Sequence, residues 1–292
     1  MKRLDSRSRG LALLLVMWAL FIMTFAIMGL LSLLKVDIGN ASGMERVALA
    51  SSLAFAGVTM GRNADFPVTG KPEKQAFPDG GRLEVIAISE NSKLNVNHLL
   101  GSGDRDTLRA LFRIWGLRDV EADTVLDCLL DYVEPGGNRR PNGAKAPQYR
   151  AAGRAAPPGR LFLSIDEMAS VLNFELVSNL KENWREYFTI YGDGTLDLTT
   201  ASPDVIRAVC RVGESSARAI QQGGSGLQDM DAVRMVMGLT EKEFETLQGQ
   251  LSLGGKVRRV RSTGFFAQAK RTIEVIYQTD GSTAAILEWR EW

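Results

Sequence analysis

The sequence predicts an α+β fold, in which a long amino-terminal helix packs on a small antiparallel sheet that is interrupted by a large helical insertion. The first observation is a run of 24 residues without charge, 11–34, near the amino terminus. The second is a set of strand-like patterns at the two ends of the remaining chain, 81–89 and 272–289. The third is helical spacing of apolar residues through most of 95–251. This order indicates a sheet domain with an inserted helical domain.

The amino terminus joins a basic leader to the apolar run. Residues 1–10 hold four basic side chains and one acidic side chain, Asp5. A helix over 11–34 would measure about 36 Å, enough to cross the ~30 Å core of a bilayer. The run is longer than the apolar part of a secretory signal peptide, and no small-residue cleavage site follows it. The positive-inside rule predicts a transmembrane helix with 1–10 in the cytoplasm and the chain after about residue 35 on the other side.

The helical pattern continues beyond the apolar run. Segment 46–60 keeps large apolar residues among small ones, which favours a helix packed on a protein surface. We therefore expect the helix to continue over 35–62, with Gly39, Asn40 and Gly43 loosening the junction.

The rest of the chain divides into a sheet domain, 63–94 and 252–292, and an inserted helical domain, 95–251. Asp280-Gly281 between two apolar runs predicts a hairpin in the sheet. Within the insertion, Leu-Asn-Val-Asn at 94–97 is similar to Leu-Asp-Leu-Thr at 196–199, and each is followed by two helical patterns. This repeat predicts two helix–turn–helix units.

The composition argues against several function classes. With 35 basic and 34 acidic residues the net charge is +1, so no global charge points to nucleic acid. The chain has one histidine, His98, and two cysteines that form no CxxC motif. These are too few ligands for a typical zinc site, and they argue against a nucleophile activated by histidine. We therefore expect a protein that is not an enzyme. A membrane-tethered enzyme is an alternative, which acidic and basic side chains meeting in a cleft of the structure would support.

The amino terminus resembles that of type IV pilins and pseudopilins. A short basic leader ends in Gly10, and the hydrophobic helix that follows runs on into an amphipathic half. The resemblance implies that a prepilin peptidase cuts after Gly10 and methylates Leu11. Most members carry a glutamate five residues into the mature chain, which neutralises the amino group of a neighbouring subunit, but here the position is Leu15. A subunit without this carboxylate is expected to add poorly beneath a neighbour and could serve as the first subunit, at the tip.

Several motifs match one family of pseudopilins in order along the chain, at 93–97, at 188–209 and in the terminal ILEWREW. From Gly10 to Trp292, the chain therefore resembles the K-type minor pseudopilin of type II secretion. The matching residues of the acidic turn are Asp131, Tyr132, Glu134, Pro135, Asn142, Gly143, Ala144 and Tyr149.

The resemblance implies a pilin-like fold with a SAM-like or helix-hairpin-helix-like insertion. It also implies an inner-membrane protein with a periplasmic carboxy-terminal domain that caps the pseudopilus tip and helps start its assembly for protein export. The implied partners are prepilin peptidase and the other minor pseudopilins, of the I and J types. The helix surface expected to pack on the partner subunits includes Val16, Trp18 and Leu20.

K-type members are associated with calcium in the insertion, so the resemblance implies a candidate calcium site in this chain. Asp131 and Glu134 could supply two of the oxygen ligands that calcium needs. Against this, the family's glutamate after Asn-Gly-Ala is Lys145, and its acidic residues after the proline are Gly136 and Gly137. Calcium is therefore a candidate ligand, and we expect no required cofactor.

Segment 199–220 also resembles a helix-hairpin-helix, which binds DNA phosphates through a glycine-rich turn. This leaves a membrane-anchored DNA-binding competence protein as the alternative function. Glu214, next to Gly213 in the turn, places a carboxylate where phosphate would approach, so we favour a structural role and no nucleic-acid partner.

Cys128 and Cys210 would face an oxidising compartment if the membrane topology is right, so a disulfide between them is permitted. Both also lie in apolar helical patterns, which suit buried free thiols.

Overall fold

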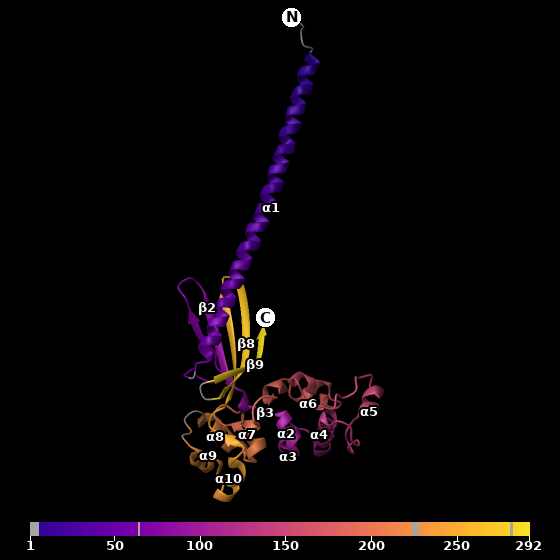
Figure 1. Ribbon diagram of the computed structural model, residues 1–292, viewed down its shortest axis with the longest axis vertical. Coiled ribbons are helices and arrows are strands. Elements are labelled where there is room, and N and C mark those ends of the chain that lie inside the picture. Colours follow the sequence, from indigo (N-terminus) through magenta and orange to yellow (C-terminus); the bar gives the residue numbers. More distant parts are fainter. Residues whose placement is uncertain (1–5, 64, 224–226, 228, 281–282) are drawn as a thin grey trace.

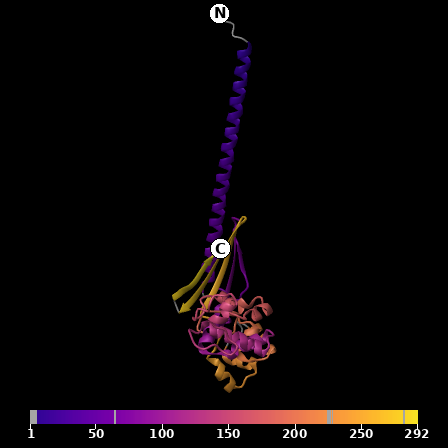
Figure 2. The same cartoon turned by 90° about the vertical axis from the view of Figure 1, so that its right-hand side faces the viewer.

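In the computed structural model, one long helix projects from a folded body (Figure 1). The structure describes residues 6–63, 65–223, 227, 229–280 and 283–292, apart from the side chains of 6–13, 31–42, 280 and 283. Helix α1 runs from Ser6 to Gly61, 56 residues, and therefore extends for about 84 Å. The sheet lies beside the last part of α1, and the helical insertion lies beyond the sheet, at the end opposite the amino terminus (Figures 1 and 2). This arrangement confirms the predicted α+β class.

Helix α1 is continuous through Gly39, Asn40 and Gly43, where the sequence predicts a looser junction. At both ends of the predicted span 11–34 the side chains lie outside the described residues. The predicted cleavage site, Gly10 and Leu11, lies in the same undescribed part. In the part of the chain that the structure describes, no helix combines the length and the apolar character needed to cross a membrane.

Five antiparallel strands form the sheet, in the order β1-β2-β7-β8-β9. Strand β2 precedes the insertion and β7 follows it, and the two pair along their length. The sheet is therefore built from chain segments that precede and follow the insertion. The strands are β1 (Glu73–Ala76), β2 (Arg82–Ser89), β7 (Val257–Phe266), β8 (Ala269–Asp280) and β9 (Thr283–Glu291).

The last turns of α1 pack across β2, β7 and β8 and bury one face of the sheet. Ala54 and Val58 of the helix meet alternating strand residues such as Val85 and Val260 in a small core. Close approach depends on Gly264 of β7, because a Cβ there would overlap the backbone carbonyl of Ala50.

The insertion consists of short helices and turns around one larger apolar core. Two parallel two-residue ladders divide it into two units: β3 pairs with β4, and β5 pairs with β6. Helices α3 and α7, one from each unit, pack against each other. The elements of the first unit are η1 (Glu90–Ser92), β3 (Leu94–Asn95), α2 (Val96–Ser102), α3 (Arg105–Ile114), α4 (Asp119–Val133), α5 (Ala146–Ala151), η2 (Ile165–Ser170), α6 (Glu175–Leu180), η3 (Trp184–Tyr187) and β4 (Phe188–Thr189). Those of the second are β5 (Leu196–Asp197), α7 (Pro203–Cys210), α8 (Glu214–Gly223), α9 (Met230–Met237), α10 (Glu241–Gln248) and β6 (Leu251–Ser252).

Local chemistry explains where these helices begin. The Asn95 side chain accepts a hydrogen bond from the backbone N–H of His98 at the start of α2, and Asp104 does the same for Thr107 in α3. Ser202 caps α7, and Pro203 takes its first position, where the missing N–H of proline costs no helical hydrogen bond. The two units therefore repeat a polar cap followed by an apolar helix.

Candidate functional site

The described apolar part of α1 is exposed all around. Large side chains between Leu14 and Leu30 are at least half exposed, and Leu15 is 66% exposed. An apolar helix surface of this kind is unfavourable in water, and no residue that the structure describes covers it. The predicted packing residues Val16, Trp18 and Leu20 all belong to this surface. A membrane or partner helices could cover it.

A second exposed apolar surface lies at the free edge of the sheet. Phe55 of α1 lies against Trp289 of β9, with 6.2 Å between their ring centroids. Both rings are exposed, as is Ile286 on the same strand. Because β9 is an edge strand and α1 covers its neighbours instead, this corner of the sheet is uncovered. We call Phe55, Ile286 and Trp289 the edge patch.

A buried ion network joins the sheet to the insertion. The carboxylate of Glu90, the first residue of η1, is fully buried and accepts from Lys93 Nζ at 2.7 Å and Arg259 Nε at 2.6 Å. Thr189 of β4 donates a third hydrogen bond to it. Burial raises the pKa of Glu90, but the two cations outweigh it and lower the pKa to about 2. Glu90 is therefore ionised and links three segments.

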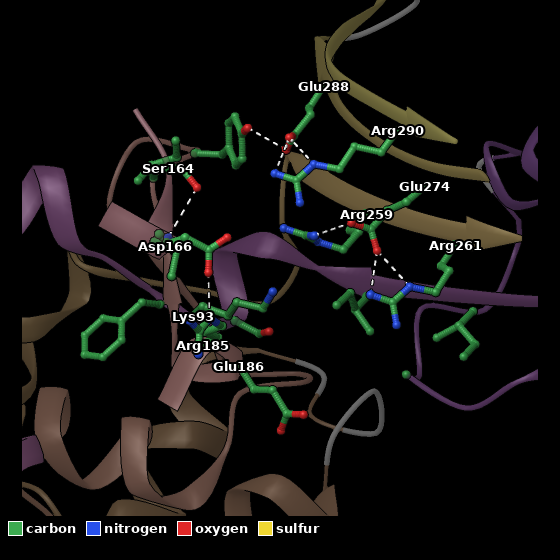
Figure 3. Close-up of a pocket in the computed structure, with 18 of the residues that line it drawn as sticks. Lys93, Ser164, Asp166, Arg185, Glu186, Arg259, Arg261, Glu274, Glu288 and Arg290 are labelled. Atoms are coloured by element: carbon green, nitrogen blue, oxygen red, sulfur yellow. Dashed lines mark hydrogen bonds and ion pairs between the residues drawn. The ribbon is translucent and has the colours of Figure 1, made fainter. Parts of the chain in front are cut away.

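The network extends into a groove of about 740 Å³ between the sheet and the insertion (Figure 3). Arg259 also binds Glu274 of β8, which in turn holds Arg261. On the insertion side of the groove Asp166 pairs with Arg185, and on strand β9 Glu288 pairs with Arg290 (Figure 3). Tyr191 donates to Glu288 at 2.7 Å, so this bond and the Glu90–Arg259 pair connect the insertion to the sheet. Because most of its charged side chains are paired, the groove is suited to joining the two domains rather than to binding a charged ligand.

Asp131 and Glu134, the candidate calcium ligands, lie together at the end of α4. Arg140 Nη1 lies between their carboxylates, 2.8 Å from Asp131 Oδ1 and 2.6 Å from Glu134 Oε2. Lys145 Nζ donates to the backbone carbonyls of both residues at 3.0 Å. The described residues contain no cluster of three His, Cys, Asp or Glu side chains able to hold a metal. Two cations already use these oxygens, so the residues present do not fit calcium.

Helices α7 and α8 form the hairpin that resembles a DNA-binding motif. The turn between them passes through Arg211, which has a φ of 58°, and α8 begins at Glu214. The Glu214 carboxylate pairs with Arg218 at 2.5 Å and lies 4.0 Å from Arg207. A negative side chain therefore stands at the helix start that would receive a phosphate, and it engages nearby cations. The geometry does not favour DNA binding.

The disulfide permitted by the sequence is not formed, because Cys128 and Cys210 are both free and buried. They lie on different helices, α4 in the first unit and α7 in the second. Cys128 donates to the carbonyl of Asn142 and accepts from the Asn173 amide. Burial raises the pKa of both thiols, that of Cys210 to about 12. They serve as packing groups in the insertion core.

Sequence reasoning missed Glu90 and Arg259, which pair across 169 positions in the chain. It also missed Arg140 as the partner of the acidic turn. Arg259 lies in a stretch of β7 that also contains Arg258 and Arg261, yet its side chain is only 19% exposed. Two features of the sequence could have indicated the Glu90–Arg259 pair: an acidic residue directly after β2, and arginines at alternate positions of β7.

Comparisons with known proteins agree with this architecture. Residues 92–183, nearly the whole first unit, match the family described as type II secretion system (T2SS), protein K. None of the curated proteins compared matches the chain. A chain in the crystal structure of the GspK-GspI-GspJ complex from the enterotoxigenic Escherichia coli Type 2 Secretion System has a similar fold, with a TM-score of 0.67 and 14% identity. The similarity covers 88% of this chain and 98% of that one. Within 92–183 the chain is therefore similar to the type II secretion system protein K family, and its overall fold is similar to that of a chain in the GspK-GspI-GspJ complex.

Proposed function

We propose that this protein is a minor pseudopilin that caps the tip of the type II secretion pseudopilus and helps start its assembly. Its work is then assembly for protein export rather than catalysis. The observation that carries the proposal is the position of the insertion, beyond the sheet and away from the exposed helix (Figures 1 and 2). If subunits pack side by side through their long helices, the insertion projects past the end of the bundle, where a subunit above this one in the filament would have to sit.

The residue at position 15 supports a place at the tip. A glutamate there would neutralise the amino group of a neighbouring subunit, whereas Leu15 offers no charge. An unpaired ammonium buried among apolar helices is costly. The first subunit of a filament has no such neighbour to neutralise, so leucine is tolerated at the tip.

The family belongs to an envelope secretion system, which supports a periplasmic position for the folded body. We propose that the chain is a single-pass inner-membrane protein over 11–34, with residues 1–10 in the cytoplasm. Prepilin peptidase would cut after Gly10 and methylate Leu11. The leader's charge and the uncharged run support this topology.

The proposed partners are the I-type and J-type minor pseudopilins, since the similar chain comes from a complex that contains GspI and GspJ. The exposed apolar residues of α1 and the edge patch offer two apolar surfaces for them. Aromatic side chains such as Trp289 commonly contribute strongly to such contacts.

Co-purification of the full chain with the I-type and J-type pseudopilins of the same system tests the proposal. We expect a ternary complex on size exclusion in detergent. Trp289→Glu should reduce its yield several-fold, because a charge would be buried in the contact. Val120→Glu is the matched control, since Val120 is 72% exposed on the insertion. A chain that elutes alone with both candidates present would refute the proposed partners.

A further inference from the structure

The end of helix α4 gathers oxygen atoms around one lysine. Lys145 Nζ donates to the backbone carbonyl oxygens of Asp131 and Glu134 at 3.0 Å each. It also lies 4.0 Å from Asp131 Oδ1. The Lys145 side chain is only 15% exposed, and the Asp131 side chain is fully buried. The ammonium is therefore enclosed by oxygens rather than extended into solvent.

A second cation completes the arrangement. Arg140 bridges the carboxylates of Asp131 and Glu134 through Nη1, and its backbone N–H donates to Asp131 Oδ2 at 3.1 Å. The hydrogen bond and charge of Arg140 lower the pKa of the Glu134 carboxyl. Gly143 lets the loop close over this site, because a Cβ there would overlap the Asp131 carboxylate. The loop and the helix end are thus tied together through two basic side chains.

Carbonyl and carboxylate oxygens at a helix carboxy terminus suit a cation for two reasons. The helix dipole places partial negative charge there. A hard divalent cation also prefers the same oxygen donors. An ammonium group is compact and has three donors, so it can satisfy several of these oxygens at once. A divalent ion would meet repulsion from both Lys145 and Arg140 at short range.

We infer that Lys145, assisted by Arg140, is a built-in cation that takes the place of a divalent metal at the end of α4. The inserted domain then keeps its acidic turn ordered without calcium. This inference concerns the stability of the turn and goes beyond the proposed role in assembly, which could hold with or without it.

The melting temperature of the full chain in detergent, followed by tryptophan fluorescence, provides the first test. We expect the same value in EDTA and in millimolar calcium, because the oxygens are already satisfied. A melting temperature that falls in EDTA or rises with calcium concentration would overturn the inference. This measurement uses the unaltered protein and does not depend on any variant folding.

Two substitutions and a matched control sharpen the test. Lys145→Met should lower the melting temperature by about 5 °C with or without calcium, because it removes the donor to the Asp131 and Glu134 carbonyls. Lys145→Glu should also melt earlier in EDTA, but added calcium should raise its melting temperature. Lys242→Met, at an exposed lysine of α10, should melt like the unaltered chain. The inference fails if Lys145→Met melts like Lys242→Met, or if calcium leaves Lys145→Glu unchanged.

Discussion

Arg259 donates from Nε to the carboxylate of Glu90 at 2.6 Å, across the point where the insertion leaves the sheet. Glu90 directly follows β2, and Arg259 lies in β7, so the bond joins the two strands that flank the insertion. Thr189 of β4 reaches the same carboxylate from the end of the first unit. One buried side chain therefore fixes the insertion on the sheet, in the orientation on which the proposed tip role depends.

Glu90→Gln should destabilise the junction in a pH-dependent way. The pKa of Glu90 is lowered from its ordinary 4.5 to about 2, so its stabilising effect is complete above pH 4.5 and is lost as the pH falls toward 2. Removing one partner of a buried ion network costs about 3 kcal/mol of unfolding free energy at pH 7. Urea unfolding at pH 7, 5 and 3 checks this.

The gap in unfolding free energy between Glu90→Gln and the unaltered chain should narrow at pH 3. Glu182→Gln, at an exposed site, should leave the unfolding curve unchanged at every pH. A gap of constant size from pH 7 to pH 3 would mean that ionised Glu90 does not hold the junction.

Gly264→Ala should loosen the packing of α1 on the sheet. The added methyl group would overlap the carbonyl of Ala50 and lie 2.6 Å from the backbone nitrogen of Ala54, so helix and strand must separate. Overpacking of this kind costs about 2 kcal/mol. Gly249→Ala is the control, because Gly249 has a φ of −68° and open space around its Cα. Equal urea midpoints for the two variants would rule out the close approach.

Both cysteines should be protected free thiols. Burial raises the pKa of Cys210 to about 12, and that of Cys128 in the same direction, so little thiolate forms at pH 8. Iodoacetamide should leave the folded chain unlabelled and add two groups after unfolding without reductant, as measured by intact mass. A chain that takes no label after unfolding would contain the disulfide.

Local patterns in the sequence predicted much of the fold. The alternation in β2, the pairing of β8 with β9 and the caps at Ser202 and Pro203 depend on neighbouring residues. Gly281 of the predicted Asp280-Gly281 turn lies outside the described residues. The repeat at 94–97 and 196–199 appears in the structure as two units, each closed by a short parallel ladder. These features need only short-range geometry.

The contacts at the site could not be predicted in the same way. Glu90 and Arg259 meet only because β2 pairs with β7 around the whole insertion. Lys145 binds backbone carbonyls, which leave no signature in the side chains of a sequence. Its substitution for a family glutamate suggested a lost ligand, but only the structure shows that the ammonium binds the backbone carbonyls of Asp131 and Glu134.

The intact mass of the protein from cells with and without prepilin peptidase tests the proposed class most directly. A pseudopilin requires a mature chain that begins at Leu11 and carries one methyl group in peptidase-competent cells, and the full leader in cells without the enzyme. A chain that still begins at Met1 when the peptidase is present would contradict the account.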